Sequence, residues 1–225
     1  MAAQLAGHEV HDLNNPLAAI KLNLTSLLDL LPQDAVDAAE ITKELQQSAL
    51  ALEGMFANHL TLAILEDPLR SERPVARVAL GDIVSAVVLK LQCAARDQRV
   101  ELSVGTQSSG AWVQADAEMM PLLVENLARN ALQHAGAGGR AVLSVTCTDG
   151  RVALTMRDTG AWFGPPERDF SREGQLALKQ SPERRYSRAL GLYVVGAITR
   201  AHGGTITVGS DPSGDSWVTV AFRAL

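Results

Sequence analysis

Cysteine is scarce in this chain of 225 residues, and basic charge is not in excess. The two cysteines, Cys93 and Cys147, stand far apart and provide neither a disulfide framework nor the paired spacing of a zinc site. This content is typical of a reducing compartment, so we expect a cytoplasmic protein. The 20 Lys and Arg against 25 Asp and Glu give a net charge of −5, which lacks the basic field that attracts nucleic acid. We therefore expect no nucleic-acid partner.

Hydrophobic runs of membrane-spanning length are also missing from the sequence. The longest run, at 190–198, contains Gly191 and Gly196 and falls far short of the roughly 20 residues that cross a bilayer. No basic segment followed by an apolar one opens the chain as a signal peptide would. We therefore expect no membrane segment in this chain. Its 47% hydrophobic and 20% charged residues are typical of a globular protein with a core.

Glycine and proline are scarce in the first 67 residues, which favours helix. Apolar residues there alternate at spacings of three and four, the seam of a coiled coil: Val10, Leu13, Leu17, Ile20, Leu24, Leu27 and Leu31. After a Leu-Pro-Gln-Asp break at 31–34, with Asp34 as a helix cap, a second series follows: Ile41, Leu45, Ser48, Leu52, Met55, His59 and Leu62. Residues 1–67 are predicted to form an all-α helical hairpin that pairs with a second copy as a homodimeric four-helix bundle.

A polar linker is predicted at 68–76, and residues 77–225 have a different pattern. Helical periodicity covers 78–96, 119–134 and 190–201, whereas strands are predicted at 100–104, 140–148, 152–157, 205–210 and 216–222. Such mixing without strict alternation predicts an α+β sandwich, with helices on one face of a mostly antiparallel sheet. The segment 161–189 has no clear periodicity and is long for a loop, which favours a lid or mobile binding element.

The most distinctive polar motif is His-Glu-Val-His-Asp-Leu-Asn-Asn-Pro-Leu at 8–17. A neutral imidazole such as that of His11 is a competent nucleophile toward a phosphoryl group. Asp12 beside it can hold the proton on the other ring nitrogen, and Asn15 shares the helix face of His11 four residues on. A polar helix start with scattered histidines, or a weak metal site at His8 and His11, are the alternative interpretations.

Three further motifs lie in the second part of the chain. Asn126 and Asn130 are one helical turn apart and suit a nucleotide–metal edge, because carboxamides offer both an oxygen and an NH₂ group. A solvated helix face explains the same pair. Asp158-Thr-Gly follows a predicted strand, but Asp-x-Gly alone is also a common turn. Ser-Arg-Ala-Leu-Gly-Leu at 187–192 leads into a predicted helix, where backbone amides can hold phosphate.

Taken in order, these motifs resemble the catalytic core of two-component sensor histidine kinases over about residues 5–224. The segment from His11 to Leu17 resembles the family's phosphoacceptor box, and the proline five residues after His11 selects that histidine over His8. The resemblance implies that Asp12 is the acid/base partner in phosphoryl transfer and that Asn15 serves dephosphorylation of a partner. The implied partner is the receiver domain of a response regulator.

The second part resembles the ATP-binding domain shared by histidine kinases, gyrases and Hsp90. The resemblance implies ATP and Mg²⁺ as cofactors, with Asn130 as the metal ligand and Asn126 nearby. It implies that Asp158 accepts a proton of the adenine amino group and that Gly160 lets the backbone close under the ring. It further implies that Gly191 belongs to the glycine box that cradles the triphosphate.

The chain departs from the family pattern in both glycine boxes. Trp162 occupies the position of a second glycine in the first box, although Gly164 lies close by. Ser187 and Ala189 replace glycines in the second box, where only Gly191 remains. Nearby arginines and Lys179 offer charge to a phosphate in their place, and the solvated surface of a lid is the alternative interpretation for most of them.

Three functions follow from these observations. The first is a kinase core that phosphorylates His11 from ATP and passes the phosphoryl group to a response-regulator aspartate. The second is an ATP-independent histidine phosphotransferase with a decayed nucleotide domain, which explains the incomplete glycine boxes. The third is a non-catalytic pseudokinase scaffold.

Overall fold

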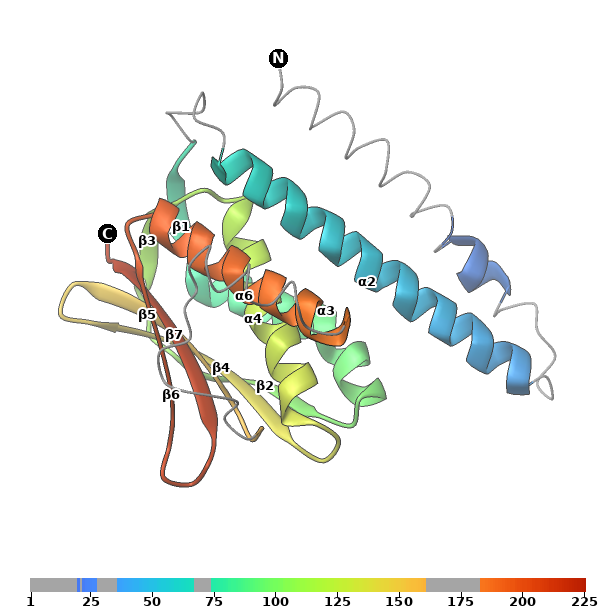
Figure 1. Cartoon of the computed structure of the whole chain (residues 1–225). Helices are drawn as coiled ribbons and strands as arrows, with labels where there is room; N and C mark the ends of the chain where they lie inside the picture. Colours follow the sequence, from blue (N-terminus) through green and yellow to red (C-terminus); the bar gives the residue numbers. More distant parts are fainter. Residues whose placement is uncertain (1–19, 21, 28–35, 67–73, 161–182) are drawn as a thin grey trace, which may run out of the picture. The chain divides into compact units, whose positions relative to one another are not determined.

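A computed structural model describes residues 20, 22–27, 36–66, 74–160 and 183–225. The chain divides into two compact units, Met1–Arg70 and Ser71–Leu225. The first is helical where it is described, and the second combines helices with strands (Figure 1). Each unit is therefore considered by itself below.

In the first unit, helix α2 spans Val36–Glu66 and contains the whole second apolar series. Residues 22–27 are also helical, and Gln46 Nε2 of α2 donates a hydrogen bond of 3.2 Å to Thr25 Oγ1. The turn at 31–34 and the helix around His11 lie outside the described residues. The long second helix of the predicted hairpin is present, and the hairpin and its bundle stay predictions.

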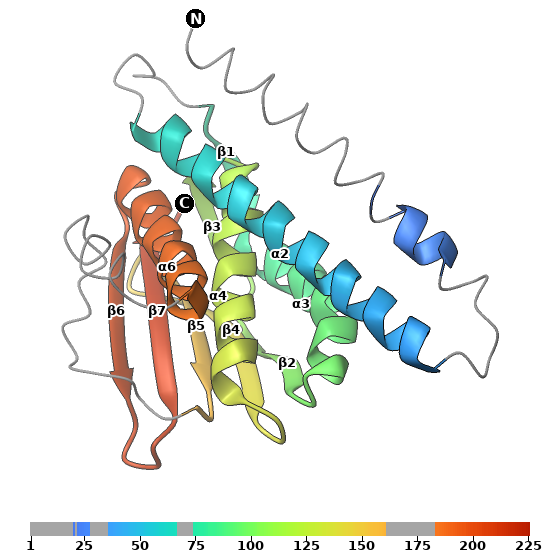
Figure 2. The same ribbon diagram turned by 45° about the vertical axis from the view of Figure 1, so that its right-hand side comes forward.

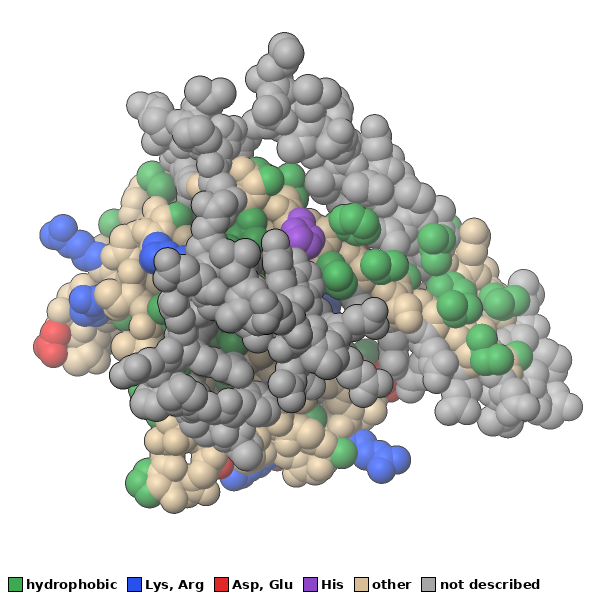
Figure 3. All heavy atoms as spheres, in the orientation of Figure 1, with side chains coloured by type: hydrophobic (Ala, Val, Ile, Leu, Met, Phe, Trp, Pro, Cys, Tyr) green, Lys and Arg blue, Asp and Glu red, His purple; other side chains and the backbone are tan. Residues whose placement is uncertain are grey.

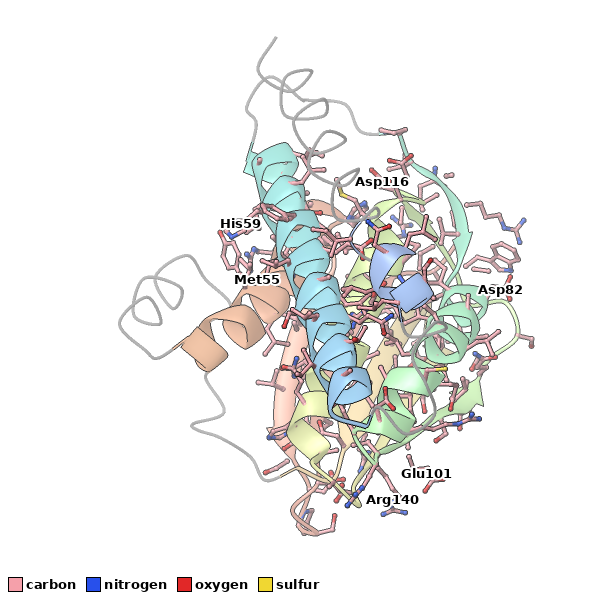
Figure 4. The ribbon with its side chains drawn as sticks, turned by 90° about the vertical axis from the view of Figure 1, so that its right-hand side faces the viewer. Met55, His59, Asp82, Glu101, Asp116 and Arg140 are labelled. Carbon is pink, nitrogen blue, oxygen red and sulfur yellow. The ribbon has the colours of Figure 1, made fainter. Side chains whose placement is uncertain are left out.

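The predicted seam of the first unit is exposed in this single chain. The exposed fractions are 58% for Ile41, 51% for Leu45 and 45% for Leu52, whereas Leu62 near the end of α2 is buried. Met55 and His59 project from α2 one helical turn apart (Figure 4), and hydrophobic side chains gather along the helix in the space-filling view (Figure 3). A helix with an exposed apolar stripe is stabilised when a partner covers that stripe.

One stretch of α2 bears on the expectation that the chain has no membrane segment. Among the described residues, Ser48–Leu65 is long and apolar enough to cross a bilayer by length and composition alone. Polar residues such as Asn58 and Thr61 divide this stretch, so it contains no long uninterrupted apolar run. The core helix of a soluble bundle has the same composition, so this stretch is weak support for a membrane span.

The second unit is built on a five-stranded sheet in the order β2-β4-β5-β7-β6 (Figure 2). Its strands are β2 (Glu101–Gln107), β4 (Arg140–Thr148), β5 (Arg151–Asp158), β6 (Thr205–Ser210) and β7 (Ser216–Arg223). Only β2 and β4 pair in parallel, and the other neighbours are antiparallel. Figure 4 shows Glu101 and Arg140 near each other, where these two parallel strands begin in register. The mostly antiparallel sheet is confirmed.

Three helices cover one face of this sheet: α3 (Leu80–Asp97), α4 (Met119–Ala135) and α6 (Glu183–Ala201) (Figure 2). Alternate strand residues face them, and β5 shows the pattern clearly, with Val152, Leu154 and Met156 all buried. The helices contribute residues such as Leu123 and Ile198, which are fully buried. The predicted α+β sandwich with helices on one face is therefore the observed fold of this unit.

Local sequence signals explain several element boundaries. Asp149 and Gly150 both have positive φ, 52° and 70°, which is the geometry of the two-residue hairpin turn that Asp-Gly predicts. Asp116 Oδ1 accepts the backbone N–H groups of Glu118 and Met119 at 2.9 and 3.3 Å and so begins α4. Figure 4 shows Asp116 at this end of the helix.

Two parts of the prediction for this unit were wrong. Residues 78 and 79 belong to β1 (Ala76–Ala79), which pairs with β3 (Trp112–Ala115), and neither strand was predicted. Strands of four residues carry little periodicity, and their pairing joins segments far apart in the chain. Helix α6 begins at Glu183, so residues 183–189 are helical and do not belong to a loop. The rest of the predicted lid, 161–182, lies outside the described residues.

Candidate functional site

The candidate site is centred on Asp158, the last residue of β5. Its side chain is 1% exposed. Oδ1 accepts hydrogen bonds from His134 Nδ1 at 2.6 Å and from the Gly160 backbone N–H at 2.9 Å. Oδ2 is buried and has no hydrogen-bond partner in the described part of the chain. A buried polar atom without a partner costs free energy, so this oxygen is suited to receive a donor from a ligand.

Gly160 is required at this site by close backbone approach. A Cβ atom at position 160 would lie 2.3 Å from the carbonyl oxygen of His134, which is backbone and cannot swing away. Ser216 Oγ also donates a hydrogen bond of 2.9 Å to the Gly160 carbonyl. The segment after β5 is therefore fixed between α4 and β7.

Helix α4 presents a row of polar residues at four-residue spacing: Asn126, Asn130 and His134. Asn126 is buried, and its Nδ2 donates to the Leu122 carbonyl at 3.0 Å. Asn130 is half-buried and lies between Asn126 and His134 on the same face. The structure thus places the predicted metal ligand one turn from the residue that contacts Asp158.

His134 is the functional candidate that sequence reasoning missed. It follows Asn130 by four residues on α4, and its side chain is 5% exposed. The signal was its spacing, because a residue four positions after Asn130 shares its helix face. The pairing with Asp158 depends on how β5 packs against α4, which the local sequence does not encode.

Gly191 lies where α6 packs against α4. A Cβ atom at this position would be 2.8 Å from Asn126 Oδ1, so the glycine allows close packing of the two helices. The structure therefore brings Gly191 to Asn126, and shows a packing role for this glycine.

The resemblance implied that residues 187–192 lie at the N-terminus of a helix, and the structure shows that they do not. They lie inside α6, which begins four residues earlier at Glu183. Amide groups inside a helix donate to carbonyl groups four residues back and are not free for phosphate. In this conformation the predicted triphosphate cradle is absent from residues 187–192.

Helix α4 also contributes Glu125 and Arg129 to a charged cluster with Lys90 of α3. Glu125 accepts hydrogen bonds from Lys90 of α3 at 2.7 Å and from Arg129 at 2.7 and 2.9 Å. Burial of the carboxyl raises its pKa, but the hydrogen bond from Lys90 and the charge of Arg129 outweigh that effect and lower the pKa of Glu125 below its ordinary value. The cluster joins α3 to α4.

His11, Asp12 and Asn15 lie outside the described residues, as does Trp162. Among the predicted nucleotide residues, the structure brings together Asp158 and Gly160 around His134, and Asn126 with Gly191.

Comparison with protein families identifies this part of the chain. Residues 115–225 match the family described as histidine kinase-, DNA gyrase B- and HSP90-like ATPases. Residues 115–225, just under half of the chain, are therefore similar to this ATPase family. The match begins at the end of β3 and includes Asn126, Asn130, His134, Asp158 and Gly191.

The curated relatives of the ATPase domain and the segment before it are sensor histidine kinases. The sensor histidine kinase RppB of Synechocystis sp. is 24% identical over 208 residues, 92% of this chain and 46% of that protein. The sensor histidine kinase YcbM of Bacillus subtilis is 23% identical over 216 residues, 96% of this chain and 69% of that protein. The chain thus spans about half to two thirds of the length of these relatives.

Solved structures confirm the ATPase fold. Full-length ShkA, crystallised with AMPPNP, has a TM-score of 0.66 and 21% identity, covering 99% of this chain and 46% of that one. The cytoplasmic segment of the histidine kinase QseC has a TM-score of 0.53 and 18% identity, covering 87% and 99%. The recognised family and the α+β fold of the second unit therefore agree.

The residues present fit an adenine nucleotide at one well-defined point of the ATPase domain. The buried, unpartnered Oδ2 of Asp158 is an acceptor that an exocyclic amino group would satisfy. Gly160 lets the backbone after β5 approach α4 closely, since a Cβ at this position would meet the carbonyl oxygen of His134.

Proposed function

We propose that this chain is the catalytic core of a two-component sensor histidine kinase. Residues 71–225 bind ATP, and the γ-phosphoryl group passes to His11 and then to an aspartate of a response-regulator receiver domain. The observation that carries the proposal is the buried free oxygen of Asp158 in a domain of this ATPase family. The motif at 8–17 supports the choice of acceptor.

The chemistry at His11 is a displacement at phosphorus. The lone pair of one ring nitrogen attacks the γ-phosphorus, and the bond to the bridging oxygen of ADP breaks. The other ring nitrogen then loses its proton to Asp12, which leaves a neutral phosphorylated imidazole. In the second step an oxygen of the receiver aspartate attacks the phosphorus and the P–N bond breaks, while Asp12 returns its proton to the other ring nitrogen, so that His11 leaves as a neutral imidazole.

The nucleotide is held through residues of α4 and the end of β5. Asp158 accepts from the amino group of the base, and Asn130 supplies a carboxamide oxygen to Mg²⁺, a hard cation that prefers oxygen ligands. When bound, Mg²⁺ neutralises charge that develops on the transferred group. Asn126 and Gly191 lie where α6 packs against α4. This packing stabilises the part of α4 that contains Asn130.

The first unit supplies the dimer in this proposal. The exposed side chains of Ile41, Leu45 and Leu52 are covered by the helices of a second copy. The relatives are sensor kinases, and the cytoplasmic segment of QseC shares the fold, which supports a cytoplasmic location for the described units. The receiver domain of a response regulator is the second protein partner.

A nucleotide titration tests the proposal. Calorimetry with Mg·ATP should show saturable binding to the wild-type chain. Asp158→Asn keeps the shape of the side chain but replaces a charged acceptor, so affinity should fall about ten- to a hundredfold. The absence of saturable binding by the wild type into the millimolar range would contradict the proposal.

The helical conformation of residues 187–192 favours the histidine phosphotransferase as a second candidate. Such a protein would use His11 as a relay and its second unit for docking. Incubation with an already phosphorylated receiver domain would label His11 in a chain that binds no ATP. That result would replace the kinase by the phosphotransferase.

A further inference from the structure

The hydrogen bonds at Asp158 are unevenly divided between its two carboxylate oxygens. Oδ1 accepts from both His134 Nδ1 and the Gly160 N–H, whereas Oδ2 is buried without a partner in the described residues. Because an ionised carboxylate only accepts hydrogen bonds, Nδ1 of His134 carries the proton. One oxygen is therefore fully used by the protein, and the other is left for a ligand.

We propose that His134 is a positioning residue that fixes the rotation of the Asp158 carboxylate and thereby selects a base with an amino group over one with a carbonyl group. The inference rests on the proposed function, since it concerns the same nucleotide site. In this proposal, the preference for an amino group depends on His134 of α4 as well as on Asp158.

The two donors to Asp158 Oδ1, His134 Nδ1 and the Gly160 N–H, restrict the orientation of the carboxylate to different degrees. The Gly160 N–H lies close along the chain and can follow either oxygen of Asp158. His134 comes from another element, and its side chain is only 5% exposed, so water cannot replace a lost partner. Rotation of the carboxylate away from His134 would leave a buried donor unsatisfied. The His134 bond therefore holds Oδ2 toward the ligand.

The position of His134 is itself fixed by backbone packing. The backbone after β5 approaches α4 so closely that a Cβ at Gly160 would lie 2.3 Å from the His134 carbonyl oxygen. Ser216 of β7 holds the same segment through the Gly160 carbonyl. The 2.6 Å bond between His134 and Asp158 thus follows from three packed elements, α4, β5 and β7.

Fixing Oδ2 toward the ligand has a direct consequence for the base. An amino group donates to Oδ2 and satisfies it. A carbonyl group at the same place would set two acceptors against each other and leave both unsatisfied. Inosine triphosphate carries a carbonyl group where ATP carries the amino group, and its neighbouring ring nitrogen carries a hydrogen, so the pair of ligands tests the hydrogen bonds at this edge of the base.

The experiment compares the affinities of ATP and inosine triphosphate, each with Mg²⁺, for the full chain and its variants by calorimetry. The wild type should prefer ATP about tenfold or more. His134→Leu should lower this preference to within about threefold of unity, because the carboxylate is then free to turn its oxygens away from the base. His134→Asn should keep the preference, since its amide nitrogen reaches the position of Nδ1, and His134→Gln should not.

The outcomes are distinguishable. If wild type binds neither nucleotide, the proposed function fails and the inference fails with it. If wild type prefers ATP and His134→Leu keeps the full preference, the inference is overturned while the proposed function stands. If His134→Leu does not fold, judged by circular dichroism, the Asn and Gln variants decide. Equal preferences in those two variants would overturn the inference.

Discussion

At the scale of single residues, the site depends on a few polar groups that the core of the second unit holds in place. Asp158 and His134 are almost fully buried, and buried polar groups are stable only when they are paired. The unpartnered Oδ2 of Asp158 therefore lowers the free energy of unfolding of the unliganded protein. A ligand that donates a hydrogen bond to this oxygen should remove the penalty. We expect ATP to raise the thermal stability of the wild-type chain.

The first residue-scale prediction concerns Asn130. Replacement by Ala should leave most of the nucleotide affinity, because the base contact at Asp158 remains. Transfer of the phosphoryl group should fall by about a hundredfold or more, because the metal that neutralises the transferred group loses an oxygen ligand. Calorimetry and a phosphotransfer assay measure the two effects separately. Equal losses of affinity and of transfer would show that Asn130 acts in binding alone.

The second residue-scale prediction concerns Gly160. Its replacement by Ala should destabilise the chain by about 2 kcal/mol or more, since the new methyl group meets the His134 backbone at 2.3 Å. Gly81→Ala is the matched control, because its Cβ would lie 3.7 Å from the nearest atom, in the Gln107 side chain. Urea denaturation measures both variants. A Gly160→Ala protein as stable as the control would contradict the close approach seen here.

At the scale of elements, charge links α3 to α4. The pKa of Glu125 is lowered in the folded state, so its contribution to stability is present above its ordinary pKa of 4.5 and is lost as pH falls through the lower, folded value. Glu125→Gln should therefore be less stable than wild type at pH 7, by about 0.5–1 kcal/mol for a pair whose Lys90 is 62% exposed.

The control for this prediction is the pH dependence itself. The stabilities of wild type and Glu125→Gln should converge as the pH falls through the lowered pKa of Glu125, because the wild-type carboxyl then also becomes neutral. Urea denaturation at a series of pH values gives both curves. A constant difference across the series would assign the effect to packing and not to charge.

Helix α2 carries the second element-scale prediction. Leu52→Glu should dissociate the dimer, because a charge in the predicted seam is desolvated when two copies meet. Leu50→Glu is the matched control, since Leu50 is also exposed on α2 but stands outside the seam series. Sedimentation velocity distinguishes the two species. A wild-type chain that sediments as a monomer would refute the predicted bundle.

The sequence predicted elements well where the signal was local. The hairpin around Asp149 and Gly150 and the strand β6 follow from turn chemistry and alternation, and both are observed. The strands β1 and β3 were missed because their stability comes from pairing across the chain. The start of α6 was misplaced because residues 161–189 show no clear helical periodicity, although Glu183, Arg184 and Arg185 are good helix formers.

The candidate site was predicted in part for the same physical reason. Motif spacing located Asp158 and the asparagine pair, and the ATPase family match covers both. The partner of Asp158 could not be found this way, since the contact with His134 forms only when β5 packs on α4. Likewise, nothing in the sequence showed that Gly191 serves the packing of α6 on Asn126.

At the scale of the whole molecule, the account joins two units with separate tasks. In the proposed function the second unit, Ser71–Leu225, binds the nucleotide, and the first unit, Met1–Arg70, contains the proposed acceptor His11. Neither unit completes the reaction alone, because one supplies the phosphoryl donor and the other the nucleophile. Transfer between them is the central claim.

Labelling of the intact chain tests this claim most directly. The protein is incubated with Mg²⁺ and ATP labelled at the γ-phosphate, and the label is followed through acid and alkali treatment. We predict an acid-labile, alkali-stable label in wild type and in His8→Ala, and none in His11→Ala. An unlabelled wild type, or a label that survives in His11→Ala and disappears in His8→Ala, would contradict the account.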